Sequence, residues 1–405
     1  MSDMPNKRDA HRRERVRTTS AWLSIALAAS LLAGCGTINS VLPSVSWPSW
    51  LGGSDSKKLG ALPDIRATVT PKVLWQASIG KAQPGLAPAV TTDAVYVASL
   101  DGNLARIELG TGRMEWRRNV GKSLTAGVGA DADTVAVGTD KGDVLAFKTT
   151  GQPLWQVRVS SEVTAPPVIG NNVVAVFSGD GRIYGLNVAD GSTKWVHQRT
   201  NPPLMVRNAT GGVLSRGGLF SGSAGGKLLA LDIGTGTVGW ESSVATPKGA
   251  TELERIADVT SLPVVEDREA CAVAFQGRIA CFEVARGVLQ WSRDISSLTG
   301  IAADDKYYYV VDDRGSIHAL DKATGASVWK QDRLAKRRLG GPQIVGEYLG
   351  VVDGEGYLHL LDRAEGNLVG RLATDGTPAT TQPTRAGNLA IWQSEGGNVY
   401  AVTAP

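Results

Sequence analysis

The feature that most constrains the fold is a segment that recurs eight times after residue 70. Each copy begins with a glycine in a turn, continues as a short apolar run, and usually ends at a second turn followed by tryptophan, as in DGRIYGLNVADGSTKW. The leading glycines lie 38 to 51 residues apart and are Gly102, Gly142, Gly181, Gly226, Gly277, Gly315, Gly356 and Gly397. A repeat of about 40 residues that reads as strands and turns is typical of a propeller blade. The repeat therefore predicts an all-β protein with one blade per copy.

Each repeat reads as four strands. Around the second copy, the runs SLTAGVGAD, TVAVGTD, DVLAFKT and PLWQVRV are short, rich in β-branched residues and separated by turn signals. The pair before the third strand, such as Asp101-Gly102 or Asp180-Gly181, favours a tight two-residue hairpin with positive φ. A second turn, such as Gly110–Gly112, joins the third strand to the outermost one.

Seven tryptophans recur with the blades, and at the eighth such position, which ends the seventh copy, the residue is Gly370. The tryptophans are Trp75, Trp116, Trp155, Trp195, Trp240, Trp291 and Trp329. One large ring per blade can bridge to the turn of the next blade and bury much of its roughly 150–250 Å². We therefore interpret these tryptophans as structural residues.

The two ends of the repeat region complete each other. The eighth copy stops after NVYAVTA and lacks an outermost strand, while the first strand, KVLWQASIG at residues 72–80, has no blade of its own. Pairing the two would close the ring and cover the last exposed sheet edge. We expect an eight-bladed β-propeller closed by this N-terminal strand.

The N-terminal residues have the pattern of a secretory signal. A basic stretch precedes the apolar run Ala21–Ala33, which is too short to span a bilayer; a buried helix is the less favoured reading. The exit, Leu32-Ala33-Gly34-Cys35, resembles the lipobox of bacterial lipoproteins. That resemblance implies cleavage before Cys35, lipidation of Cys35 and, with no Asp at Gly36, anchoring at the periplasmic face of the outer membrane.

These patterns divide the chain into a lipoprotein signal peptide at residues 1–34, a lipidated cysteine with a flexible Ser-, Pro- and Gly-rich linker at 35–65, and the propeller at 66–405. The signal peptide holds six basic and three acidic residues, so it carries the whole formal charge of +3. The remaining body has no net charge with which to attract nucleic acid over long range. We expect no nucleic-acid partner.

The blade signature with its tryptophan resembles the propeller of PQQ-dependent alcohol dehydrogenases, which makes a periplasmic quinoprotein the alternative function. That family implies a catalytic Asp, Ca²⁺-binding Glu and Asn, and adjacent cysteines beside the quinone. This sequence has no adjacent cysteines, and His197, His318 and His359 are too scattered for a metal cluster. We expect no catalytic residue, no metal and no cofactor.

A lipobox followed by such a propeller resembles the BamB family, lipoproteins of the outer-membrane β-barrel assembly machinery. The resemblance implies a non-enzymatic scaffold that binds the POTRA domains of the barrel subunit BamA and assists unfolded outer-membrane protein clients. Two segments where the repeat is lengthened, PPLMVRN at 202–208 and GATELERIADVTSLPVV at 249–265, are similar to the BamA-contacting segments of that family. The partner-binding residues implied are Leu204, Val206, Arg207, Glu252, Glu254, Arg255 and Asp258.

Two features of these segments, and one basic run elsewhere in the chain, need a separate interpretation. Leu204 and Val206 could instead begin a strand of the fourth blade. The pair Thr251 and Glu254 has the spacing of a capping box, which predicts a short helix on the rim. The basic run RLAKRR at 333–338 is more typical of a solvated loop than of a site.

Cys271 and Cys281 flank the Gln276-Gly277 turn. A two-residue hairpin there would place Ala272 opposite Cys281 and turn Cys271 to the other face, so a disulfide would need a different turn length. The periplasm would permit a disulfide. The sequence leaves this pairing open.

Overall fold

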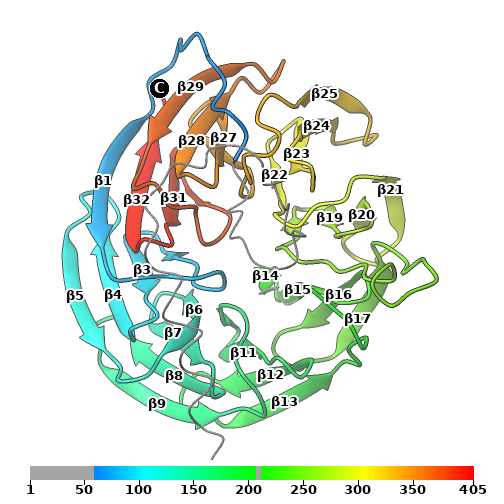
Figure 1. The fold of residues 1–405 in the computed structure, drawn as a ribbon. Helices are drawn as coiled ribbons and strands as arrows, with labels where there is room; N and C mark the ends of the chain where they lie inside the picture. The colour runs from blue at the N-terminus through cyan, green and yellow to red at the C-terminus, as the bar shows by residue number, and fades with distance from the viewer. Residues whose placement is uncertain (1–58, 207–210) are drawn as a thin grey trace, which may run out of the picture. The chain divides into compact units, whose positions relative to one another are not determined.

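The computed structural model describes residues 59–206 and 211–405, which form eight four-stranded antiparallel sheets arranged in a ring (Figure 1). The residues described contain strands and turns, and no helix long and apolar enough to cross a membrane occurs among them. Cys35 and Arg207 lie outside the described residues. The prediction of an eight-bladed all-β propeller is confirmed.

The strands of the first four blades, from the inner to the outer strand, are β2 (Ala89–Val90), β3 (Ala94–Ala98), β4 (Asn103–Glu108) and β5 (Met114–Asn119); β6 (Leu124–Ala130), β7 (Thr134–Thr139), β8 (Asp143–Lys148) and β9 (Pro153–Arg158); β10 (Val168–Gly170), β11 (Val173–Phe177), β12 (Arg182–Asn187) and β13 (Thr193–Gln198); and β14 (Gly212–Ser215), β15 (Gly218–Ser223), β16 (Lys227–Asp232) and β17 (Val238–Ser243).

The strands of the last four blades, in the same order, are β18 (Val264–Val265), β19 (Glu269–Val273), β20 (Ile279–Glu283) and β21 (Leu289–Arg293); β22 (Ile301–Ala303), β23 (Tyr307–Val311), β24 (Ile317–Asp321) and β25 (Ser327–Gln331); β26 (Gln343–Val345), β27 (Tyr348–Val352), β28 (Tyr357–Leu361) and β29 (Leu368–Ala373); and β30 (Thr384–Ala386), β31 (Leu389–Gln393), β32 (Asn398–Thr403) and β1 (Lys72–Ser78).

The ring closes as the sequence predicts. The inner strand of each blade contacts the inner strands of its two neighbours, and β2 of the first blade contacts β30 of the eighth. The N-terminal strand β1 pairs antiparallel with β32, from Lys72 opposite Thr403 to Ser78 opposite Asn398. Apolar side chains fill the space between adjacent blades; Trp75, Val97 and Ile391 belong to one such cluster at the closing seam.

Each recurring tryptophan docks onto the following blade. Every indole N–H donates to a main-chain carbonyl at 2.7–2.9 Å: Trp75 to Leu109, Trp116 to Thr149, Trp155 to Val188, Trp195 to Ile233, Trp240 to Val284, Trp291 to Lys322, and Trp329 to Arg363. The ring also covers a glycine in the receiving turn. A Cβ at Gly112, which has φ 73°, would lie 2.5 Å from Trp75. The tryptophans are therefore joints between blades.

The hairpins between the second and third strands differ from the predicted two-residue turns. In the first blade, the Ser99 N–H donates to the Asn103 carbonyl at 2.9 Å, which leaves three residues in the loop. Gly102, the last of them, has φ 82°. A three-residue loop that ends in a left-handed glycine still matches the strand twist. The positive φ was predicted correctly at this glycine, and the loop length was wrong.

The same loop length decides the cysteine pairing in the fifth blade. The Ala274 N–H donates to the Arg278 carbonyl at 3.0 Å, so this loop also holds three residues, with the positive φ at Gln276. The register therefore shifts by one, and Cys271 lies directly opposite Cys281. The two cysteines form a disulfide. The placement of Ala272 opposite Cys281 was wrong because it assumed a two-residue turn.

Candidate functional site

The first lengthened segment links β13 to β14 and carries exposed apolar side chains. Leu204 is 44% exposed and Met205 is 40% exposed. Val206 is half-buried, and its main-chain N–H donates to the Asp258 carboxylate at 2.6 Å. Leu204 and Val206 precede the fourth blade and are not part of a strand. The loop thus presents two apolar residues next to a fixed point of its backbone.

Asp258 of the second lengthened segment is buried and binds the backbone of the first segment. It is 2% exposed, and its second carboxylate oxygen accepts the Gly225 N–H at 2.8 Å. Its main-chain carbonyl accepts the Phe275 N–H at 2.7 Å. A buried carboxylate that accepts two backbone N–H groups holds those backbones in place. Asp258 therefore positions the Val206 loop, and its side chain is not presented on the surface.

The second lengthened segment links β17 to β18 and contains the predicted capping box. The Glu254 carboxylate accepts the N–H groups of Ala250 and Thr251, and the Glu254 N–H donates to the Thr251 hydroxyl at 3.3 Å. The hydrogen bonds that the Thr251 and Ala250 N–H groups donate to the carboxylate are the main reason why the pKa of Glu254 lies below its ordinary value. The predicted helix is wrong, because the cap is followed by a single turn, closed by the Arg255 N–H on the Thr251 carbonyl.

This turn raises further side chains above the rim. Leu253, at its tip, is 68% exposed. Glu252 and Arg255 are exposed and form an ion pair at 3.3 Å, and Arg255 also donates to the Gly249 carbonyl. We call residues 199–206 and 249–258 together the rim surface. The structure thus connects Val206 to Asp258 directly, whereas Glu252, Glu254 and Arg255 bond within their own turn.

A hollow of about 240 Å³ lies beside the first segment, at the junction of the third and fourth blades. Met205, Val206 and Asp258 line it together with Arg199. The Arg199 guanidinium donates to the Gly222 carbonyl at 3.2 Å, and burial lowers its pKa to about 10. The predicted residues did not include Met205, Leu253 or Arg199. Met205 and Leu253 each lie between two predicted contact residues, and this position in the sequence could have identified them.

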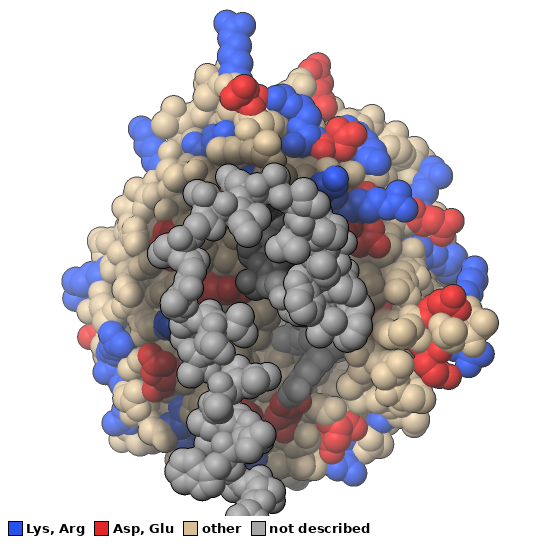
Figure 2. Space-filling view, viewed as in Figure 1, with Lys and Arg blue, Asp and Glu red and all other residues tan. Residues whose placement is uncertain are grey.

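Charged side chains of both signs are interspersed around the rim of the face drawn in Figure 2. This mixture agrees with the zero net charge of the chain beyond residue 34. Mixed charge favours association through local complementarity over long-range attraction to a polyanion.

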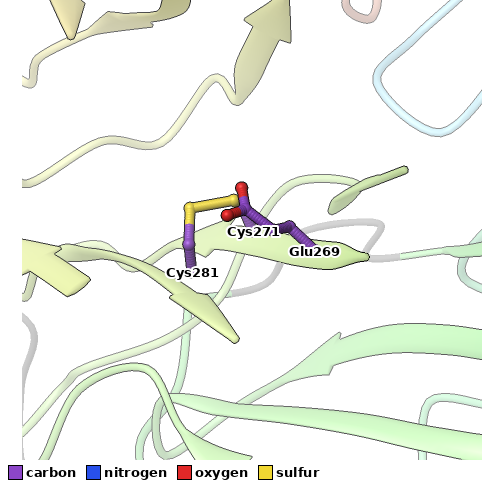
Figure 3. Close-up of side chains that lie close together, drawn as sticks. All are labelled: Glu269, Cys271 and Cys281. Carbon is purple, nitrogen blue, oxygen red and sulfur yellow. A yellow bond between two sulfur atoms is a disulfide. The ribbon is translucent and has the colours of Figure 1, made fainter. Parts of the chain in front are cut away.

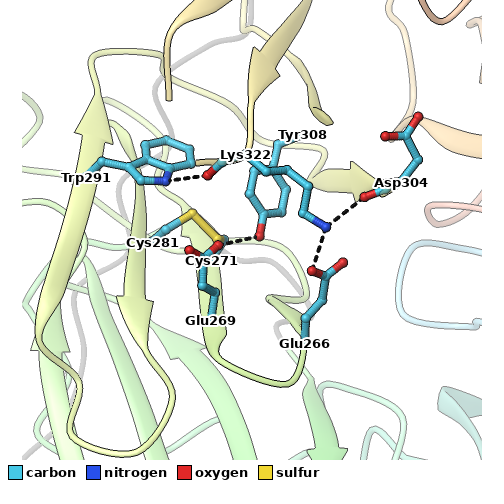
Figure 4. Close-up of a disulfide and its surroundings, with 8 residues drawn as sticks. All are labelled: Glu266, Glu269, Cys271, Cys281, Trp291, Asp304, Tyr308 and Lys322. Atoms are coloured by element: carbon cyan, nitrogen blue, oxygen red, sulfur yellow. Dashed lines mark hydrogen bonds and ion pairs between the residues drawn. A yellow bond between two sulfur atoms is a disulfide. The ribbon is translucent and has the colours of Figure 1, made fainter. Parts of the chain in front are cut away.

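Within the described part of the chain, one group of residues has the types and spacing of metal ligands: Glu269, Cys271 and Cys281 (Figure 3). The bond between the two sulfurs removes both thiolates, which are the form of cysteine that binds metals. Glu269 instead accepts the Tyr308 hydroxyl at 3.1 Å, as Figure 4 shows. Burial raises the pKa of Tyr308, so this phenol stays a hydrogen-bond donor. We assign the group a structural role.

The neighbourhood of the disulfide joins the fifth blade to the sixth. Lys322 lies 5.2 Å from the centre of the Tyr308 ring and donates to the Glu266 carboxylate at 2.6 Å and to the Asp304 carbonyl at 2.7 Å. Trp291 docks onto the Lys322 carbonyl (Figure 4). The bonds from Tyr308 to Glu269, from Lys322 to Glu266 and from Trp291 to Lys322 cross between the two blades, whereas the bond from Lys322 to Asp304 lies within the sixth.

A pocket of about 480 Å³ lies among the inner strands of the ring. We call it the axial pocket, and its lining residues decide whether pyrroloquinoline quinone and Ca²⁺ would fit there. Pro167, Ile169, Leu214 and Leu262 are among its apolar lining residues, with threonines, serine and glutamine as the polar ones. No described lining residue carries a charge. Ca²⁺ prefers carboxylate oxygens, and pyrroloquinoline quinone is itself an anion with several carboxylates. The described lining therefore does not fit that cofactor.

Comparison with known proteins gives a consistent family. Residues 100–331 and 315–404 match the family described as outer membrane protein assembly factor BamB. The BamB of Bordetella pertussis is 38% identical, covering 96% of this chain and 98% of that protein. The BamB of Nitrosomonas eutropha is 40% identical, covering 86% of this chain and 85% of that protein.

Solved structures support the same assignment. The crystal structure of BamB from Moraxella catarrhalis is similar, with a TM-score of 0.75, 26% identity, and coverage of 82% of this chain and 100% of that one. A quinohemoprotein alcohol dehydrogenase from Comamonas testosteroni has a TM-score of 0.65 at 12% identity, with coverage of 82% of this chain and 76% of that one. The second likeness shows the shared propeller fold alone.

Proposed function

Because the chain belongs to the BamB family of outer membrane protein assembly factors, we propose that it is a non-enzymatic, lipid-anchored scaffold in the assembly of outer-membrane β-barrel proteins. The observation that carries the proposal is the rim surface, whose two segments are joined by the Val206–Asp258 hydrogen bond and expose Leu204, Met205 and Leu253. Exposed apolar patches rimmed by polar residues mark interaction sites, and Met and Arg are enriched at protein–protein interfaces.

We propose that the rim surface binds the POTRA domains of BamA. Leu204 and Val206 would supply apolar contacts, and Arg207 would pair with an acidic group of the partner. Glu252, Glu254 and Arg255 would form the polar edge, where charges steer association more than they add affinity. Asp258 would act indirectly, by holding the Val206 backbone.

A pull-down with the full-length protein tests this surface. We expect Leu204→Ala and Leu253→Ala to weaken co-purification of BamA without lowering the melting temperature, since both side chains are exposed. Leu74→Ala is the matched control, because Leu74 is 52% exposed on the outer strand β1. Unchanged capture of BamA by both rim variants would refute the assignment.

We propose that Cys35 is lipidated and holds the protein at the periplasmic face of the outer membrane, with unfolded barrel proteins as its clients. Two or more acyl chains anchor stably, since each buried CH₂ contributes about 0.8 kcal/mol. We expect Cys35→Ser to leave the propeller folded and to release it from the membrane. The measurement is made where the protein cannot contact BamA, so that BamA cannot retain the variant. Retention of that variant in the membrane fraction would overturn the anchor.

The alternative is a periplasmic quinoprotein dehydrogenase. The shared propeller fold favours it, and the uncharged lining of the axial pocket opposes it. Dye-linked alcohol oxidation by the purified protein after addition of pyrroloquinoline quinone and Ca²⁺ would overturn the scaffold proposal. We expect no activity above that of the cofactor alone.

A further inference from the structure

The segment that precedes the closing strand, residues 59–69, lies against the seventh blade, and we call it the strap. Its first contacts are made by the Gly60 main chain: the N–H donates to the Lys336 carbonyl at 3.1 Å, and the carbonyl accepts the Arg337 guanidinium at 2.6 Å. The partners belong to the basic run at 333–338, which links β25 to β26. That run is a binding element, and the solvated-loop interpretation does not hold for Arg337.

Two more arginines bind carbonyl groups of the strap. Arg371 of β29 donates to the Pro63 carbonyl at 2.7 Å, and Arg333 donates to the Asp64 carbonyl. Bonds to main-chain carbonyls fix the path of a chain whatever its side chains are. Three cationic donors on the carbonyls of residues 60, 63 and 64 form a clamp, and each such charge-assisted bond is stronger than a neutral one.

Neighbouring side chains hold two arginines of the clamp, Arg337 and Arg371, in place. Arg337 is 2% exposed and pairs with Asp353 at 2.7 Å and with Glu355 at 2.6 Å. His359 bonds the same Asp353 oxygen at 2.9 Å, and Arg371 donates to the other His359 nitrogen at 3.3 Å. Although burial opposes it, the hydrogen bonds from His359, the Tyr357 N–H and Arg337 keep the pKa of Asp353 below its ordinary value. The clamp is therefore preorganised and charged.

The other end of the strap occupies the place of the missing tryptophan. The N–H groups of Thr68 and Val69 both donate to the Val369 carbonyl, at 2.9 and 3.0 Å. A Cβ at Gly370 would lie 2.7 Å from the Val69 carbonyl oxygen, and the buried Val69 packs with Leu360 and Tyr400. The glycine that interrupts the tryptophan pattern thus admits the strap between the seventh and eighth blades.

The strap and the first segment of the rim surface lie across the ring from each other, because that segment links the third blade to the fourth and the strap contacts the seventh. In an eight-bladed ring the seventh blade faces the third, and Figure 1 shows β29 at the top of the ring and β13 at the bottom. In a four-stranded meander, the links between blades and the turns between second and third strands emerge at the same end. The clamp loop at 332–342 and both segments of the rim surface are such links, so they share one face of the propeller.

We propose that the arginine clamp fixes where the membrane tether leaves the propeller, so that the membrane and the protein partner meet the same face on opposite sides of the ring. This inference rests on the proposed lipidation of Cys35. Without the clamp, the first fixed point would be Thr68 and Val69 at the Val369 carbonyl, and residues 60–67 would add roughly 26–29 Å of slack. Tension on the tether would also load the strand that closes the ring.

The test compares the lipidated full-length protein with a double variant, Arg333→Ala with Arg371→Ala. Arg337 is kept, because its loss would leave Asp353 buried without its cation. We expect exchange of the Gly60 amide to become at least about tenfold faster, as loss of charge-assisted bonds predicts, and trypsin to cut sooner after Arg66. Arg385→Ala is the control, because Arg385 is exposed and donates to a main-chain carbonyl, that of Gly387, in the eighth blade. Unchanged exchange in the double variant would overturn the clamp.

Orientation is measured on vesicles that carry an acceptor dye. A donor dye is placed on the third blade through Lys194→Cys or on the seventh through Glu365→Cys, both at exposed positions. We expect greater energy transfer from the seventh blade, and loss of that difference in the clamp variant. Equal transfer from both positions in the parent protein would refute a fixed exit. Failure of the parent protein to bind vesicles would instead refute the Cys35 anchor, while the exchange result would still decide the clamp.

Discussion

Replacement of Asp258 separates a positioning role from direct contact with the partner. Asp258 is buried, and its two carboxylate oxygens accept the N–H groups of Val206 and Gly225. A hydrogen bond to a charged group contributes roughly 1.5–3 kcal/mol. Asp258→Ala removes both and leaves two partly buried N–H groups without an acceptor, so we expect a loss of about 3–6 kcal/mol in the free energy of unfolding.

Asp258→Asn is the graded control. The amide keeps one acceptor oxygen of the same shape, so only one of the two bonds is lost and the expected cost is about 1.5–3 kcal/mol. Because the Val206 loop then loses its fixed point, capture of BamA should weaken in the same order, with alanine worse than asparagine. Both quantities are measured on the same preparations, by denaturant unfolding and by quantitative pull-down.

The reasoning predicts that stability and capture fall together. If Asp258→Ala abolished capture while the unfolding midpoint stayed at its parent value, the carboxylate would be a direct partner contact and the burial argument would be wrong. If unfolding shifted as expected and capture did not change, the rim surface would not depend on the Val206 loop.

Three further predictions test the scaffold. Cys271→Ser with Cys281→Ser should lower the free energy of unfolding by about 2.7 kcal/mol, the chain-entropy value for a loop of ten residues, and a reductant should then have no further effect on unfolding. Gly112→Ala should cost about 2–4 kcal/mol, because its φ is positive and its Cβ would meet Trp75; Gly110→Ala, which has open space, should cost far less in the same thermal scan. Burial lowers the pKa of His359 below its ordinary 6.5, so stability present above pH 6.5 should be lost as pH falls through the lower folded value. His359→Gln keeps a neutral donor and acceptor and should flatten this pH dependence of unfolding; an unchanged slope would contradict the assignment.

The ring could be predicted from the sequence because the same sequence signals recur in each blade. Eight leading glycines and seven tryptophans report the same four-stranded unit, so the blade number and the pairing of β1 with β32 follow from counting. Local turn geometry could not be predicted in the same way. Two- and three-residue hairpins have similar sequence signals, and the difference of one residue moved Cys271 to the position opposite Cys281.

The candidate site was only partly predictable for a related reason. The lengthened intervals marked the segments correctly as departures from the repeat, and the exposed Leu204 could be expected there. Nothing in the sequence distinguishes an acidic residue that faces a partner from one that faces the backbone of its own chain. Asp258 and Glu254 both satisfy N–H groups of their own chain, although both stand in a segment whose charges suggested outward contact.

Gly370 shows why a departure from a repeat carries information about function. A tryptophan at this position would occupy the space of the Val69 backbone, so one seam cannot hold both a docked indole and the strap. Seven of the seams between blades hold a docked tryptophan. The seam between the seventh and eighth blades holds the strap instead, and the chain enters the propeller there. A propeller with eight identical seams would have its closing strand as its first point of attachment. The absent tryptophan is therefore what allows the tether to be held by the seventh blade, across the ring from the first segment of the rim surface.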